Sequence, residues 1–260
     1  MLPRRVRDLE RLGRMSSIER SYRETAKDYA YRIIRDSIVN FGKKPGETIS
    51  DMEISQQLGI SRTPVREAIM KLKGESDIID IFPQRGMRVA LIDMDLVRQA
   101  RLLRVTLEKE VAMDCCDYAS PDDITRLEEN LALQEFFCGR GMFRELFQKD
   151  NEFHHELFCI SRNEMLYRVV AAVSIHYDRV RNLESEDLAH SQNTIADHRA
   201  ILDAVQAGDR ERAGREIENH LGRYLMNVKG LIEKYPEYFV PQDGHAGLPG
   251  AADGAAGKKD

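Results

Sequence analysis

Apolar side chains in the first third of the chain recur at helical spacing and are interrupted by turn residues. Residues 22–39 place apolar groups every three or four positions, which predicts an amphipathic helix. Two further helices are predicted at residues 51–58 and 62–74, on either side of Gly59, and a serine that can act as N-cap directly precedes each of them. We therefore expect three helices in this part of the chain.

Two short β-type runs follow, and after them the strand signals vanish. Residues 78–82 and 87–92 surround the sequence Pro-Gln-Arg-Gly and are expected to form a hairpin. From Asp93, an expected N-cap, helical spacing continues almost to the end of the chain. Further helices are predicted at residues 94–119, 121–137, 142–160, 164–183, 187–207 and 210–234. The pattern predicts a mainly α protein.

Length and composition fit a soluble globular protein of two domains. A chain of 260 residues is longer than one compact core usually needs. No apolar run approaches the ~20 residues of a membrane span, and the Arg-rich N-terminus lacks the apolar segment of a secretory signal. We therefore expect no membrane partner, a cytoplasmic location and four cysteines that are buried and reduced.

The net charge of −5 is an average over two unlike segments. Residues 1–90 carry 18 Lys or Arg against 13 Asp or Glu, a net of +5, and the rest of the chain carries a net of −10. A basic module joined to an acidic one fits a protein whose first part meets a polyanion such as nucleic acid. Chance is the alternative explanation for so modest an excess.

Residues 51–69 have the spacing of a helix-turn-helix. Gly59 occupies the turn, where a positive φ is needed. Five apolar positions are expected to pack the two helices together: Ile54, Leu58, Ile60, Val65 and Ile69. The hairpin that follows would be the wing of a winged helix-turn-helix. A pair of ordinary bundle helices is the alternative, but it does not require an Arg-Thr-Pro-Val-Arg start or a basic hairpin.

The start of the second helix and the tip of the wing carry the groups expected to contact DNA. A helix-turn-helix holds its second helix in the major groove. Arg62, Thr63 and Arg66 lie on the exposed start of that helix, and the planar fork of arginine suits guanine edges or phosphate. Arg85 would lie at the wing tip, where Gly86 allows close approach to the DNA backbone or minor groove.

The sequence SRTPVREAI followed by PQRGMRV resembles the DNA-binding domain of the GntR family of bacterial transcription regulators. One segment departs from the family pattern. Between the second helix and the wing, the family usually has Glu-Gly-Leu-Val or a similar sequence. This chain has KGESDIIDIF, which is about one residue longer and lacks the glycine of that pattern. The resemblance implies a homodimer that binds a palindromic double-stranded operator.

A second set of residues, in the helical part, has side chains suited to metal ligation. Asp150 and His154 are four residues apart on one predicted helix, so their side chains share a face. His198 and His220 lie on two later helices that could converge with the first. Three imidazoles and one carboxylate can hold a divalent cation and leave room for a ligand. The alternative is that each histidine is separate, because the chain has four others.

The runs DNEFHHELF and HRAILDAVQAGDRERAGREIENHL resemble the FCD domain, the ligand-binding domain of the fatty-acid-regulator-like GntR subgroup. The resemblance implies that Asp150, His154, His198 and His220 bind a divalent transition metal. Zinc is favoured, with nickel, manganese or iron as alternatives.

The same resemblance implies an effector site beside the metal. Arg104, on the first long helix, would face the cavity and pair with the carboxylate of a small organic acid, and Arg181 or Arg179 would assist it. A surface salt bridge from Arg104 to Glu108 is the alternative. Effector binding would change the spacing of the two recognition helices, and relief of repression is favoured over activation.

Together these features predict four segments along the chain. They are a flexible basic arm at 1–20, a winged helix-turn-helix domain at 21–92, an all-helical antiparallel bundle at 93–236 and a disordered tail at 237–260. We expect a DNA-binding regulator and not an enzyme. A metal hydrolase is disfavoured because HHELF lacks the HExxH arrangement, and a third interpretation is a hydrogen-bonded core without metal.

Overall fold

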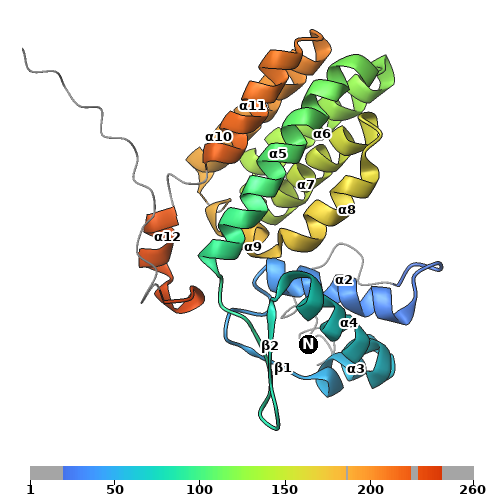
Figure 1. The fold of residues 1–260 in the computed structure, drawn as a ribbon, viewed down its shortest axis with the longest axis vertical. Helices are drawn as coiled ribbons and strands as arrows, with labels where there is room; N and C mark the ends of the chain where they lie inside the picture. The colour runs from blue at the N-terminus through green and yellow to red at the C-terminus, as the bar shows by residue number, and fades with distance from the viewer. Residues whose placement is uncertain (1–19, 186, 224–227, 242–260) are drawn as a thin grey trace, which may run out of the picture.

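A small domain of helices and short strands lies below a larger bundle of helices (Figure 1). The computed structural model describes residues 20–185, 187–223 and 228–241. The predicted fold class is confirmed, since a winged helix-turn-helix domain is followed by an all-helical domain.

The N-terminal domain combines a helix-turn-helix with an antiparallel sheet. Its elements are α2 (Ala26–Val39), β1 (Thr48–Ile49), α3 (Asp51–Leu58), α4 (Arg62–Ser76), β2 (Ile79–Phe82) and β3 (Gly86–Val89). Strand β3 lies between β1 and β2 and is antiparallel to both. The hairpin of β2 and β3 was predicted. Strand β1 was not, because two residues carry no readable alternation.

The helix-turn-helix begins and turns where the sequence predicts. Ser50 accepts a hydrogen bond from the backbone N–H of Glu53 at 3.2 Å and so caps α3. Gly59 ends that helix with a φ of 67°, a left-handed conformation that a side chain would strain. Ser61 precedes α4 in an extended conformation, but its side chain makes no capping hydrogen bond.

The two domains share buried side chains. Ile54, Val65 and Ile69 are buried between the helices of the N-terminal domain, as the sequence predicts. Phe147 and Ile175, which belong to the bundle, complete the same cluster. Full burial of one such side chain stabilises by about 1.5–3 kcal/mol relative to exposure, so this shared cluster holds the domains together.

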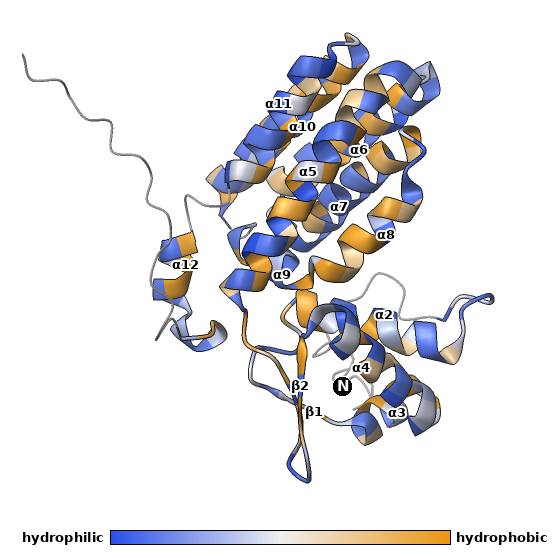
Figure 2. Ribbon diagram, viewed as in Figure 1, coloured by the Kyte–Doolittle hydropathy of each residue, from blue (hydrophilic) through white to orange (hydrophobic). Residues whose placement is uncertain are grey.

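The second domain is a bundle of helices joined by short turns. It comprises α5 (Met94–Tyr118), α6 (Pro121–Gly139), α7 (Phe143–Ile160), α8 (Glu164–Val173), α9 (Ile175–Glu184), α10 (Leu188–Gln206) and α11 (Arg210–Gly222). Helix α11 packs against α5 and α10, and α6 packs against α7 and α10. Hydrophobic and hydrophilic residues alternate along these helices (Figure 2). Asp93 accepts backbone hydrogen bonds as the predicted N-cap of α5, and Asp209 caps α11 in the same way.

Two predicted helices are each divided in the structure. The segment predicted as one helix at 164–183 is α8 and α9, which meet at Ser174, where ψ is 5°. The break lets Val170 enter the bundle core while Ile175 enters the core of the N-terminal domain. The segment predicted as one helix at 210–234 is α11 and a separate α12 (Val228–Lys234), whose Leu231 belongs to a different cluster from α11.

The ordered chain continues past the predicted end of the bundle. A 3-10 turn, η2 (Pro236–Tyr238), follows α12, and Phe239 is buried and pairs with Ile92. The prediction that the disordered tail begins at residue 237 is therefore wrong for 237–241. The rest of that tail and nearly all of the predicted basic arm lie outside the described residues.

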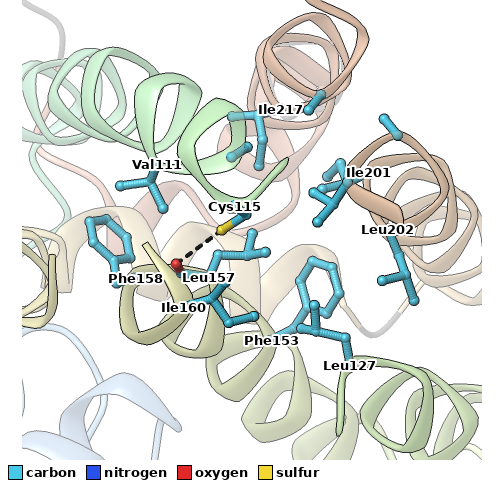
Figure 3. Close-up of a cluster of buried hydrophobic side chains, with 14 of the residues drawn as sticks. Val111, Cys115, Leu127, Phe153, Leu157, Phe158, Ile160, Ile201, Leu202 and Ile217 are labelled. Atoms are coloured by element: carbon cyan, nitrogen blue, oxygen red, sulfur yellow. Dashed lines mark hydrogen bonds between the residues drawn. The ribbon is translucent and has the colours of Figure 1, made fainter. Parts of the chain in front are cut away.

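The centre of the bundle is a dense apolar cluster contributed mainly by α5, α7, α10 and α11 (Figure 3). Cys115 lies within it, and its thiol donates to the carbonyl of Leu157 at 3.2 Å. All four cysteines are free, but Cys159 is exposed, so the prediction that all are buried is wrong.

None of the helices in the described residues combines the length and apolar character of a membrane span.

Candidate functional site

The residues predicted to contact DNA are all exposed. Arg62, Thr63 and Arg66 lie in the first turns of α4. Arg85 and Gly86 lie at the turn of the β2–β3 hairpin, which projects away from the bundle (Figure 1). Gly86 has a φ of 93°, so the turn requires a residue without a side chain at that position.

An acidic residue that sequence reasoning missed holds two of these arginines. Asp51, the first residue of α3, accepts hydrogen bonds from Arg62 at 3.0 Å and from Arg66. Burial raises the pKa of Asp51, but the hydrogen bonds from Arg66 and Arg62 outweigh it and leave that pKa below its usual value. The arginine side chains are 51% and 64% exposed, so both can still reach a ligand.

The four residues of the candidate metal set converge inside the bundle. Asp150 and His154 project from α7, His198 from α10 and His220 from α11, and their ligand atoms all lie within 4.8 Å of one another. Nε2 of His154 is 3.2 Å from Nε2 of His220, and Nε2 of His198 is 3.6 Å from Oδ1 of Asp150. Ligand atoms that share one cation at about 2.0–2.2 Å lie roughly 3–4 Å apart, so the set is close to the geometry of a single-ion site.

Each imidazole of the set turns Nε2 toward the other ligands and Nδ1 toward a second polar side chain. The pairs are His154 with Glu108 at 2.7 Å, His198 with Gln134 at 2.9 Å and His220 with Asp197 at 3.5 Å. Outer partners of this kind fix the orientation and basicity of metal-binding imidazoles. Sequence reasoning did not find these three partners, because none of them forms a short-range pattern with its histidine.

The protonation of the histidines suits cation binding. Burial lowers the pKa of His154, of His198 and of His220, the last to about 4. The rings are therefore neutral near pH 7 and keep a nitrogen lone pair. Nε2 of His198 is fully buried and makes no hydrogen bond within the described part of the chain. Such an unpaired buried atom costs about 1–3 kcal/mol, so the donor set fits a divalent metal.

Arg181 of α9 borders the cluster. It donates hydrogen bonds to Asp150, to Asn151 at 3.0 Å and to Asp178 at 3.1 Å. Asp150 accepts this bond through Oδ2 and turns Oδ1 toward His198. The carboxylate of Asp150 thus connects the candidate metal set to the guanidinium group of Arg181.

Arg104 pairs with Glu108, as in the alternative that the sequence left open, but the pair is buried and not at the surface. Arg104 is 3% exposed and donates to Glu108 through Nε at 2.5 Å and through Nη2 at 3.3 Å. The expectation that Arg104 faces the cavity is not met, because the side chain folds along α5 to the acid one turn later. Burial raises the pKa of Glu108, but Arg104 and His154 hold that pKa well below its usual range. Arg104 therefore acts on the candidate metal set only through Glu108, which faces His154.

A cavity opens beside the candidate metal set. Its walls include Asp150 and His220 from the metal set, Arg181 and Glu184 from α9, and Arg223 after α11, but not Arg104. Sequence reasoning missed Glu184 and Arg223, since a single charged residue in a helix carries no signal of its burial. Acidic and basic side chains therefore both line the cavity.

Helix α9 also contacts the N-terminal domain and the segment that joins it to the bundle. Arg179 is fully buried and donates a hydrogen bond to the carbonyl of Ala90 at 2.9 Å, and Asn182 donates to the carbonyl of Val39 at 2.8 Å. Since other residues of α9 line the cavity, this helix lies between the cavity and the DNA-binding domain.

Two parts of the chain match known families. Residues 26–89 match the family described as bacterial regulatory proteins, gntR family, and residues 99–223 match the FCD domain. Both matches coincide with the resemblances seen in the sequence.

Individual relatives agree with these matches. The HTH-type transcriptional repressor RspR of Escherichia coli (strain K12) is 30% identical over 209 residues, which cover 80% of this chain and 91% of that protein. Among solved structures, E. coli McbR/YncC has a TM-score of 0.71 at 18% identity, covering 81% of this chain and 99% of that chain. A putative transcriptional regulator GntR from Rhodococcus sp. RHA1 has a TM-score of 0.67 at 22% identity, covering 78% and 97%. At these identities the two structures support the fold alone.

Proposed function

The chain belongs to the GntR family of bacterial transcriptional regulators, in the group with an FCD domain, and we propose that it is a repressor controlled by a small carboxylate effector. As a family member it is a DNA-binding regulator and not an enzyme. The proposal adds that the effector binds at a metal site in the bundle and that binding there lowers operator affinity.

One observation carries the proposal. The four candidate ligands converge in the bundle, and two of them, Asp150 and His220, line a cavity whose walls also hold Arg181 and Arg223. Neutral imidazoles favour a cation, and a cation beside arginines favours an anion. This combination suits a carboxylic acid better than an uncharged ligand.

We assign the metal to Asp150, His154, His198 and His220. When bound, a divalent cation would supply a positive centre with open positions for oxygen ligands. Zinc is favoured because three imidazoles and one carboxylate suit it, although nickel, manganese and iron accept the same donors.

We assign the effector carboxylate to Arg181, which already pairs with acidic side chains through its planar fork. Arg104 supports the site indirectly, because Glu108, its partner, faces His154. An effector that draws Arg181 away from its present partners would move α9 relative to the N-terminal domain.

DNA binding is assigned to residues 21–92, and effector binding and dimerisation to residues 93–236. Arg62, Thr63 and Arg66 would enter the major groove, and the wing with Arg85 and Gly86 would approach the DNA backbone or minor groove. These five residues sit at the exposed start of α4 and the exposed turn of the hairpin, which supports the assignment. A homodimer would present two such domains to a palindromic operator in the cytoplasm.

Control by effector requires different affinities for two arrangements of the dimer. An acid that binds the non-operator arrangement more tightly shifts the population toward it. By linkage, operator DNA then weakens acid binding by the same factor.

A thermal-shift screen of small carboxylic acids on the full-length protein, with and without a chelator, tests the proposal. We expect at least one acid to raise the melting temperature and to release operator DNA, and we expect the chelator to abolish both effects. A shift that survives the chelator would favour the core without metal. No response to any acid would contradict the proposed effector site.

A further inference from the structure

A buried acid in the cavity wall has no side-chain hydrogen bond in the part of the chain that the structure describes. Glu184, the last residue of α9, is 3% exposed, and neither Oε1 nor Oε2 makes a hydrogen bond. Nε2 of His190 lies 3.9 Å from Oε2 of Glu184, which is beyond hydrogen-bond reach. A buried carboxyl without hydrogen bonds is destabilising, so this position favours a ligand that supplies them.

Other polar side chains of the same wall are already paired. The hydroxyls of Ser185 and Ser191 donate to backbone carbonyl oxygens at 2.8 and 2.9 Å, and Arg223 pairs with Asp197 at 2.6 Å. Glu184 differs from them, because it lines the cavity and neither of its carboxyl oxygens makes a hydrogen bond within the described residues.

We propose that Glu184 binds a hydroxyl group of the effector, and hence that the effector is a small hydroxy acid. This inference rests on the proposed function, in which the carboxylate of the acid faces Arg181. Arg181 and Glu184 are three residues apart on α9 and share a face of that helix. A molecule of a few carbon atoms can therefore reach both side chains at once.

The protonation of Glu184 supports a hydroxyl partner over an ammonium group. Burial raises the pKa of Glu184 to about 8, against a weaker opposing effect of Arg181. A neutral carboxyl both donates and accepts a hydrogen bond, and a hydroxyl does the same. An ammonium group only donates, and it prefers an ionised carboxylate.

The test uses full-length, metal-loaded protein and two sets of acids. Within each set the acids differ only in the substituent on one carbon atom. One set is L-malate, L-aspartate and succinate, and the other is 3-hydroxybutyrate, 3-aminobutyrate and butyrate. Titration calorimetry gives the Kd of each acid. We expect the hydroxy acid to bind about tenfold or more tightly than its unsubstituted counterpart, because the latter leaves Glu184 unpaired.

Two variants of Glu184 separate recognition from packing. Glu184→Leu should bind the hydroxy acid and the unsubstituted acid equally, with the metal content unchanged and a melting temperature no lower than that of the wild type. Glu184→Gln should keep the preference, since its amide also donates and accepts.

Three results would overturn the inference without contradicting the proposed effector site. They are equal affinities of the wild type for the acids of one set, a preference for the amino acid, and a hydroxyl preference that persists in Glu184→Leu. Failure of all six acids to bind would overturn the proposed effector site and this inference with it.

Discussion

Arg35 of α2 donates a hydrogen bond to Asp178 of α9 at 3.0 Å, and this contact joins the DNA-binding domain to the helix that borders the cavity. The other oxygen of Asp178 accepts a hydrogen bond from Arg181 at 3.1 Å. One carboxylate therefore connects the arginine assigned to the effector with an arginine of the winged helix-turn-helix domain. A change in the partners of Arg181 alters the electrostatic environment of Arg35.

Replacing that carboxylate should weaken the coupling between effector and operator. In Asp178→Asn, we expect the change in operator affinity caused by an effector acid to fall severalfold from a wild-type factor of about 5–150. Fluorescence anisotropy with labelled operator, with and without the acid, measures it. Asp95→Asn removes an exposed carboxylate at the start of α5 and serves as the control. An unchanged factor in folded Asp178→Asn would argue against this contact as the link.

Loss of one arginine of the recognition helix should weaken operator binding specifically. Arg66→Ala is expected to cost about 1–3 kcal/mol of binding free energy at the operator if the side chain contacts a base, and less on unrelated DNA. Arg215→Ala, which removes an exposed arginine of α11, matches the change in charge. Operator affinity in moderate salt equal to that of the control would reject the assignment of α4. Sedimentation should show the same oligomer for both variants.

Asp51 should act on specificity through the two arginines that it holds. In Asp51→Asn, Arg62 and Arg66 lose a negative partner, so more positive charge is available to any phosphate. We expect affinity for unrelated DNA and its salt dependence to increase, and the ratio of operator to unrelated affinity to fall. A ratio equal to or above that of the wild type would show that Asp51 does not orient these side chains.

His176 should make the joint between the domains sensitive to acid. Its Nδ1 accepts a hydrogen bond from the backbone N–H of Asp93 at 3.1 Å. Burial, and to a smaller extent the charge of Arg179, lowers the pKa of His176 from 6.5 to about 4. Because the unfolded chain binds this proton more tightly, stability is lost as pH falls from about 6.5 to about 4, by up to about 3 kcal/mol.

Urea unfolding of the wild type and of His176→Gln across that pH range isolates the contribution of this histidine. We expect the stability of the wild type to fall more steeply with acidification than that of the variant. Parallel pH profiles would contradict the proposed effect of His176.

Local patterns predicted most of the fold, because its helices and turns depend on residues close in sequence. The turn at Gly59 and the N-caps at Asp93 and Asp209 follow from single residues and their neighbours. The division of the predicted helix at Ser174 does not, since it depends on Val170 and Ile175 entering different cores.

The candidate site could be predicted only in part. Asp150 and His154 share a helix face, but the approach of His198 and His220 depends on tertiary packing, and only the family resemblance indicated it. Arg104 pairs with Glu108, one turn away along α5, instead of facing the cavity. The partners of the histidines and the unpaired carboxyl of Glu184 depend on contacts between distant helices, which no local pattern encodes.

Metal analysis of the purified full-length protein tests the central claim most directly. His154→Ala removes a ligand, whereas His155→Ala is the matched control, because the His155 ring packs against Tyr167 outside the set. We predict about one equivalent of divalent transition metal per chain in the wild type and in His155→Ala, and loss of that metal in His154→Ala. Less than about 0.2 equivalents in wild-type protein, with no thermal shift on adding zinc, nickel or manganese, would contradict the account.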